Sequence, residues 1–517
     1  MATADDPAKR VFNVRQLFHR TVLQFWLACG LYHALSVLGP TYLVLDLHAS
    51  ASIVGLAGST FALGRLMSSV PAGSFVSRFG YKHAIATGSV AMAAMSVVVG
   101  ATGYMGVPRN DSNLLTRATT SNASAFLVSS PSPSPLPPLL SSPSPSLISE
   151  RGSPIGIFVV YFICVFGVGL GYGLNFIGMH TFLSGNVAKH RRGAAFSCHG
   201  GTFRLAGIAF PLIAGAFGSA LGLPNALMLT AVFPLAAAAL TAAFLPAPLP
   251  PSSTTQEKEQ VVGKEVDSKV IPLPPQRSPR CWSACQLVWD FRRALLSVGV
   301  FVTLLSLVRA GREILIPLIA IEQGLGISEI SYAQSVSYIC GSSMFPLSGI
   351  IMDRFGRKRN AAISLCIFAL GLVVLSLADG SFGMLVLGSA TVGLGNGISS
   401  GLVMTLGGDL VMQIEDEAKR GPFLGAYKTV SDIGSLLGPI LSGALTAEVG
   451  TRGAALMLVG FAGAALLWLF FLVKETRPTS EEEMDAEIGE AVECGGDVAW
   501  AGGEEILELQ GMQFVTI

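Results

Sequence analysis

Residues 349–358 read GIIMDRFGRK, and residues 73–82 read GSFVSRFGYK, the same pattern 276 positions earlier. Each copy lies between two long apolar stretches. A basic stretch bracketed by glycines is too polar to enter hydrocarbon, and its positive charge favours the cytoplasmic side of a membrane. The repetition therefore predicts a duplicated membrane bundle with one basic loop in each half.

A second repeat supports the duplication and locates an insertion. Arg192 and Pro211 align with Arg420 and Pro439 at an offset of 228 residues. Because the two offsets differ by 48 residues, the first half carries extra chain. Residues 107–154 are rich in Ser and Pro, a composition that buries too little apolar surface to fold. We predict a disordered extracytoplasmic loop there.

The composition is that of a membrane protein. The chain has 517 residues, of which 51% are hydrophobic and 13% charged, and its mean hydropathy is +0.59. About 20 apolar residues cross the roughly 30 Å of hydrocarbon in a bilayer. Runs of this length begin near residues 21, 52, 84, 155, 194, 224, 294, 328, 360, 382, 422 and 453. We predict an all-α protein with twelve transmembrane helices in two pseudo-symmetric six-helix halves.

Charge and polarity divide the chain further. Lysines and arginines precede the first apolar run and recur in alternate loops, which predicts that both termini are cytoplasmic. Residues 478–517 carry eleven acidic and no basic side chains. The predicted parts are an N-terminus (1–20), an N-terminal half (21–246), a central cytoplasmic linker (247–293), a C-terminal half (294–475) and an acidic cytoplasmic tail (476–517).

Several function classes find no support in the sequence. The eight cysteines lie mostly in apolar runs and make no disulfide or zinc pattern, so we expect no metal and no cofactor. Glycine clusters lie within the spans without a preceding strand, which excludes a nucleotide loop, and nothing points to nucleic acid. No histidine pair with a carboxylate, paired aspartates or serine with a base suggests an enzyme within the membrane.

The two basic loops resemble the signature of the major facilitator superfamily, G-x-x-x-D-R-x-G-R-[KR]. The second copy matches it fully, whereas the first has Ser77 at the aspartate and Tyr81 at an arginine. The resemblance covers residues 21–475 and implies two six-helix halves. It also implies that the aspartate latches the cytoplasmic ends of the halves, which leaves Asp353 for that role. The implied gating residues are Gly73, Arg78, Gly80, Lys82, Gly349, Asp353, Arg354, Gly356, Arg357 and Lys358.

A further pattern of the family, G-x-x-x-G-P-x-x-G-G, marks the fifth helix of many antiporters. Residues 434–443 nearly match it, but on the eleventh predicted helix, and the fifth-helix counterpart around Pro211 is degenerate. Small residues let helices approach closely, and proline loosens a helix that must bend. We assign helix bending to Pro211, Gly434, Gly438 and Pro439.

Ionisable residues in the middle of predicted spans are the candidate site. Each costs on the order of 3 kcal/mol in hydrocarbon, so it normally faces a cavity or a partner. These residues are Arg65, Arg204, Arg309, Arg312, Glu313 and Asp432, and Asn175 and Asn396 join them from echoing glycine-rich stretches. One interpretation is a cavity that binds an anion through guanidinium groups while an acid exchanges a proton. The other is an ion-pair network, or interhelical hydrogen bonds, that holds helices in register.

The predicted function is secondary active transport of a small solute by alternating access. We expect a proton-coupled carrier, with organic anions as the first substrate class because four arginines face two acids. A lipophilic-drug exporter is the alternative within this class, and a transporter-like sensor or a membrane-embedded enzyme lies outside it. The expected partners are the solute, protons and the lipid bilayer, and we expect a monomer.

Overall fold

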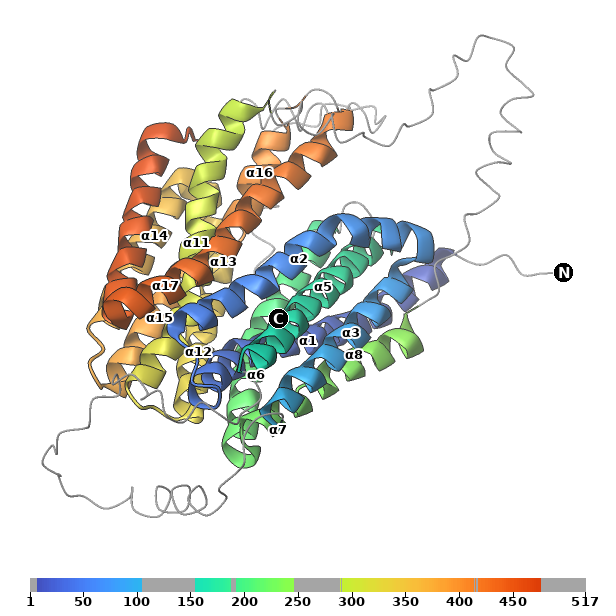
Figure 1. The fold of residues 1–517 in the computed structure, drawn as a ribbon. Helices are drawn as coiled ribbons and strands as arrows, with labels where there is room; N and C mark the ends of the chain where they lie inside the picture. Colours follow the sequence, from blue (N-terminus) through green and yellow to red (C-terminus); the bar gives the residue numbers. More distant parts are fainter. Residues whose placement is uncertain are drawn as a thin grey trace, which may run out of the picture.

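The computed structural model describes residues 7–104, 154–186, 192–245, 289, 291–412, 414 and 417–475. The described residues are helical and include no strand (Figure 1). The Ser/Pro-rich loop, most of the central linker and the acidic tail lie outside them, so those predictions stay predictions. The helices form two bundles that lie side by side, one from each half of the chain.

All twelve predicted apolar runs fall on helices. The N-terminal half contains α1 (Pro7–Leu45), α2 (Ala51–Phe79), α3 (Tyr81–Ala101), η1 (Thr102–Tyr104), α5 (Pro154–Asn186), α6 (Arg192–Leu221), α7 (Leu223–Leu229) and α8 (Val232–Phe244). The C-terminal half contains α11 (Arg292–Glu322), α12 (Ile327–Ser343), α13 (Phe345–Phe355), α14 (Arg357–Ser376), α15 (Phe382–Ile398), α16 (Leu402–Met412) and α17 (Glu417–Leu472). Helix α1 begins at Pro7, before the predicted span start near residue 21.

Length and hydropathy agree with a membrane bundle. Within the described ranges, nine helical segments are long and apolar enough to cross a bilayer, and the bent helix α2 makes a tenth. One of the nine, Phe423–Leu472, contains two of the predicted spans, because Gly450 with φ 73° interrupts α17. The opposite case also occurs, because several single spans are built from two helices, such as α12 with α13 and α15 with α16.

At each of the two predicted basic loops, a single glycine connects one helix to the next. Helix α2 continues to Phe79 and α3 begins at Tyr81, while α13 continues to Phe355 and α14 begins at Arg357. The residues between them are Gly80 with φ 82° and Gly356 with φ 90°. A side chain disfavours these positive angles, so glycine allows a helix to end and the next to begin without a longer loop.

The two halves meet most closely at one end of the bundle. Helix α2 packs against α17, and α6 packs against α12. A Cβ atom on Gly55 would overlap the backbone of Pro439 and Gly443, and one on Gly215 would overlap the side chain of Ser331. Small residues thus allow backbone contact between the halves. We call this the closed end; it carries the start of α2 and the C-terminal end of α6.

Candidate substrate cavity

A cavity of about 430 Å³ lies between the two halves. Volumes of this size are typical of small-molecule sites. It reaches the closed end, where Val54 and Pro439 line it, and it extends to Arg65, which is ten residues or about 15 Å along α2 from Gly55. Its aromatic lining is Tyr32, Phe61, Tyr161, Phe203 and Tyr338. Its charged lining is Arg65, Arg204, Arg309, Arg312, Lys428, Glu313 and Asp432.

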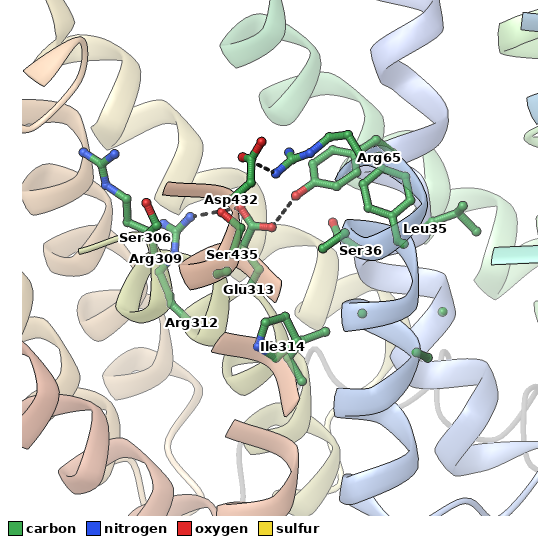
Figure 2. A pocket seen from close by; sticks show the side chains of 18 of the residues that line it. Leu35, Ser36, Arg65, Ser306, Arg309, Arg312, Glu313, Ile314, Asp432 and Ser435 are labelled. Carbon is green, nitrogen blue, oxygen red and sulfur yellow. Dashed lines mark hydrogen bonds and ion pairs between the residues drawn. The ribbon is translucent and has the colours of Figure 1, made fainter. Parts of the chain in front are cut away.

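The structure gathers seven of the eight candidate residues around this cavity. They come from both halves of the chain and from five helices or helix junctions. The seven are Arg65, Arg204, Arg309, Arg312, Glu313, Asp432 and Asn396. Figure 2 shows Arg65 of α2, Arg312 and Glu313 of α11 and Asp432 of α17 converging in this region, with the guanidinium of Arg309 apart from them.

Asn175 lies elsewhere. It is buried in α5, and its amide donates to Ser89 Oγ at 2.8 Å and to the carbonyl of Ile85 at 3.3 Å, both on α3. It is not among the residues that line the cavity. The structure therefore places Asn175 in a helix interface, as in the alternative interpretation of this residue.

One carboxylate is shared by two cations. Arg65 on α2 donates to Asp432 Oδ1 on α17 at 3.1 Å, and this ion pair crosses between the halves (Figure 2). Lys428, one turn before Asp432 on α17, donates to the same oxygen. The Asp432 side chain is only 9% exposed, against 30% for Arg65 and 41% for Lys428. The carboxylate is thus the buried centre of the group, and it neutralises one of two positive charges.

The second carboxylate is held by hydroxyl groups from both halves. Glu313 accepts from the hydroxyl of Tyr32 on α1 at 2.5 Å and from that of Tyr338 on α12 at 3.2 Å. Arg312 lies 3.5 Å from the same carboxylate, and it also donates to Ser337 Oγ at 2.9 Å. Arg312 is 2% exposed, so its charge is compensated within the protein.

Two further arginines contact neutral groups. Arg309 on α11 donates to the carbonyl of Ser399 at 2.6 Å and also to its hydroxyl. Arg204 on α6 donates to the hydroxyl of Ser400, and its guanidinium carbon lies 5.1 Å from the centre of the Phe345 ring. Among the described residues, neither arginine has a carboxylate within ion-pair distance. The cavity lining therefore holds five cations and two carboxylates.

Sequence reasoning missed three polar residues of this site. Lys428 lies near the start of an apolar run, where a lysine usually only marks the cytoplasmic side of a span. Its spacing of four from Asp432 could have predicted an ion pair on one helix face. Tyr32 and Tyr338 look like ordinary aromatic residues in a span. Only the packing of α1 and α12 around α11 shows that their hydroxyl groups face Glu313.

The second copy of the signature motif anchors the end of the last helix. The Glu475 carboxylate accepts the backbone N–H groups of Arg357 at 2.9 Å and Lys358 at 3.1 Å. Lys358 Nζ donates to the carbonyls of Phe470 and Val473, at 2.9 and 3.0 Å. Arg357 also forms an ion pair with Asp409 on α16 at 3.2 Å.

The first copy has a different environment. Arg78 is exposed, with its guanidinium carbon 5.4 Å from the centre of the Phe79 ring, and Ser77 Oγ donates to the carbonyl of Ser74 at 2.9 Å. A Cβ on Gly73 or Gly349 would meet open space, so packing does not demand glycine at either position. The side chain of Asp353 lies outside the described residues, and its role as a latch stays a prediction.

The residues assigned to helix bending are mainly points of close approach. A Cβ on Gly434 would overlap the carbonyl of Thr303, and one on Gly438 would overlap that of Leu307, both on α11. Pro439 faces Gly55 at the closed end, and Pro211 lies within α6. The non-helical residue within α17 is Gly450, eleven residues beyond Pro439.

Comparison with known proteins decides the family. The model of the Major Facilitator Superfamily matches residues 138–311 and 301–500. The chain belongs to this superfamily. It aligns with the crystal structure of the nucleoside transporter NupG with a TM-score of 0.57 at 14% identity, over 88% of this chain and 97% of NupG. A D-xylose-proton symporter gives 0.61 at 13% identity, over 90% and 99%. These likenesses show the major facilitator fold, with its helices in two halves.

Curated relatives match over shorter stretches. A triacylglyceride transporter of Mycobacterium tuberculosis is 38% identical over 97 residues, which is 18% of each chain. The efflux pump dotC of Dothistroma septosporum is 28% identical over 189 residues, or 36% of this chain and 30% of the pump. The chain thus spans only 18% and 30% of the length of these two relatives. Family and fold place it among integral, multi-pass membrane transporters rather than enzymes.

Proposed function

We propose that this transporter moves a small organic anion by alternating access and is driven by a proton gradient. The observation that carries the proposal is the charge of the cavity lining, five cations against two carboxylates. Buried charge in a membrane protein needs a partner, and an anionic substrate supplies the missing negative charge. Guanidinium groups suit this role because their planar N–H groups match carboxylate and phosphate oxygens.

The contacts between the halves suggest how access alternates. With both termini in the cytoplasm, the closed end faces outward and the cavity is reached from the cytoplasm. Arg65 to Asp432, Tyr32 to Glu313 and Arg204 to Ser400 are three polar contacts that cross between the halves at the cavity. Rocking of one half against the other changes these contacts and separates Gly55 from Gly443, so the site opens outward.

We assign the proton to Glu313. Its carboxylate accepts hydroxyl groups from both halves, those of Tyr32 and Tyr338, and lies 3.5 Å from Arg312, so a change of charge there acts on both halves. Asp432, by contrast, has both Arg65 and Lys428 on one oxygen and serves as the ion-pair partner of these cations. Proton binding at Glu313 weakens its attraction for Arg312 and alters the contact with Tyr32 on the opposite half, which couples the proton to the motion.

The test is uptake into proteoliposomes that contain the full-length protein. Labelled carboxylates, amines, sugars and lipophilic dyes are offered with and without an imposed pH gradient. The proposal expects accumulation of an anion that depends on the gradient in wild type and is lost in Glu313→Gln. Gradient-driven uptake of amines or sugars, with no anion transported, would overturn it.

Export of lipophilic compounds is the second candidate. It is supported by the aromatic and aliphatic part of the cavity lining, including Tyr32, Phe61 and Phe203, and by the relative named as an efflux pump. A neutral lipophilic dye separates the two functions, because an exporter moves the dye and is insensitive to Arg309→Gln. An anion carrier leaves the dye in place.

A further inference from the structure

Two arginines from opposite halves converge on one break in a helix. Helix α15 ends at Ile398 and α16 begins at Leu402, and Gly401 between them has φ 79°. Arg309 reaches the carbonyl and hydroxyl of Ser399, and Arg204 reaches the hydroxyl of Ser400. Both serines are buried, and neither is part of the cavity lining, whereas both arginines are.

These serine groups satisfy the arginines only in part. A guanidinium carries five N–H donors, and its best acceptors are ionised oxygens. The three acceptors at Ser399 and Ser400 are neutral. The Nε atom of Arg309 is buried and has no hydrogen-bond partner. Arg309 also lies within electrostatic range of both Arg204 and Arg312. Arg204 and Arg309 therefore carry positive charge with no carboxylate within ion-pair distance among the described residues.

Aromatic rings adjoin this charge. Phe203 precedes Arg204 on α6, and its ring centre lies 5.8 Å from that of Tyr32. Tyr32 in turn lies 5.0 Å from Phe61, so these three lining residues form a continuous aromatic wall on the N-terminal half. Such a wall favours the flat face of an aromatic ligand, since aromatic pairs gain more than their buried area provides.

We propose that the ligand of this site is an aromatic organic anion. Its anionic oxygens bind Arg204 and Arg309 and displace Ser399 and Ser400, while its ring lies against Tyr32, Phe61 and Phe203. The inference rests on the proposed transport function and names the substrate class within it. The anionic group is a carboxylate or a phosphoryl group, which share the oxygens that a guanidinium recognises.

Displacement gives the ligand a mechanical role. Arg204 belongs to the N-terminal half, and Arg309 belongs to the C-terminal half. An anion held by both arginines draws the two halves together at the cavity. Ligand binding therefore replaces the contact of Arg204 with Ser400 by a stronger bridge of charges, which favours closure of the halves around the substrate.

The experiment measures thermal stability of the purified full-length protein in detergent. A ligand that binds only the folded state raises the unfolding temperature in proportion to occupancy. The probes are benzoate, phenyl phosphate, cyclohexanecarboxylate, acetate, inorganic phosphate and benzyl alcohol. The proposal expects stabilisation by benzoate or phenyl phosphate, whichever head group fits, with an affinity at least about tenfold above that of cyclohexanecarboxylate. Benzyl alcohol should give no shift.

Variants locate the site. Arg204→Gln and Arg309→Gln should each weaken binding of the aromatic anion by about tenfold or more, with Arg204→Lys and Arg309→Lys intermediate. Arg452→Gln, an exposed arginine on α17, is the matched control and should bind as wild type does. Ser400→Ala removes the group that the ligand displaces, so its affinity should equal or exceed that of wild type.

Three results would overturn the inference while leaving the transport proposal intact. Acetate or inorganic phosphate binding as tightly as the aromatic anions would remove the role of the ring. Full binding by both arginine-to-glutamine variants would remove the site. A tenfold loss in Ser400→Ala would make the serine part of the bound site instead of a displaced group. If no anion binds, whether or not benzyl alcohol does, the anion-transport proposal itself fails.

Discussion

Arg65 and Arg309 project into the same cavity from opposite halves, but they have different partners. Arg65 donates to the carboxylate of Asp432, whereas Arg309 donates to the carbonyl and hydroxyl of Ser399. The difference separates two functions for one residue type. An arginine with a buried acid forms a contact between helices, and an arginine with neutral partners keeps charge available for a ligand. The same contrast distinguishes Arg312, beside Glu313, from Arg204, at Ser400.

The largest effect is expected when both arginines without an acid are removed. In the double variant Arg204→Gln with Arg309→Gln, anion uptake should fall to background. Each loss of a hydrogen bond to a charged group costs about 2 kcal/mol, or roughly thirtyfold, so two losses exceed a hundredfold. Uptake by proteoliposomes measures this, with Arg452→Gln as control. Uptake above a tenth of the wild-type rate would contradict the assignment.

A second large effect, on proton coupling, is expected when the carboxylate of Glu313 is removed. Glu313→Gln keeps the size of the side chain and removes its exchangeable proton. Wild-type uptake should rise as the outer pH falls, and the variant should show a flat pH profile without accumulation. Exchange of anion against anion should persist in the variant, because exchange needs no net proton movement. A variant that still concentrates the anion along a pH gradient would exclude Glu313 as the proton carrier.

A moderate effect follows from making Arg65 resemble Arg309. Asp432→Asn leaves Arg65 and Lys428 without their carboxylate and adds positive charge to the cavity. The KM for an anion should fall by a few-fold, because the field at the cavity becomes more attractive. Adding Arg65→Gln restores the balance of charge and should return KM toward the wild-type value. A KM that rises in Asp432→Asn would contradict this electrostatic account.

The smallest effect is expected outside the cavity. Asn175→Ala removes the hydrogen bonds to Ser89 and Ile85 between α5 and α3. Hydrogen bonds between membrane helices contribute about 0.6 kcal/mol on average, so stability should fall by about 1 kcal/mol. Thermal unfolding measures the loss, and KM for the anion should stay at the wild-type value. A changed KM with unchanged stability would return Asn175 to the substrate site.

Much of the fold was predictable because its signals are local. Apolar runs of about 20 residues fix the spans, and the repeat of residues 73–82 at 349–358 fixes the duplication. The single-residue connections at Gly80 and Gly356 were harder to predict. A basic, glycine-containing stretch reads as a loop, and only the positive φ angles show that one residue suffices to end one helix and begin the next.

The sequence allowed us to predict which residues belong to the site, but not which of them contact one another. A charge within an apolar run stands out, and this found Arg65, Arg204, Arg309 and Asp432. Which arginine meets an acid depends on contacts between residues as far apart as Arg65 and Asp432, 367 positions along the chain. Sequence spacing carries no information on such contacts. Asn175 illustrates the same limit, because an asparagine within a span has the same sequence pattern whether its side chain lines a cavity or joins two helices.

The most direct test of the account compares single substitutions at Arg309 and Arg65. Uptake of labelled benzoate, or of phenyl phosphate if that probe binds better, is measured for Arg309→Gln and Arg65→Gln in parallel. The account predicts that Arg309→Gln raises KM by about tenfold or more, while Arg65→Gln changes it by less than about threefold. Equal losses in the two variants would contradict it, because the presence of a buried acid would then not separate contact arginines from ligand arginines.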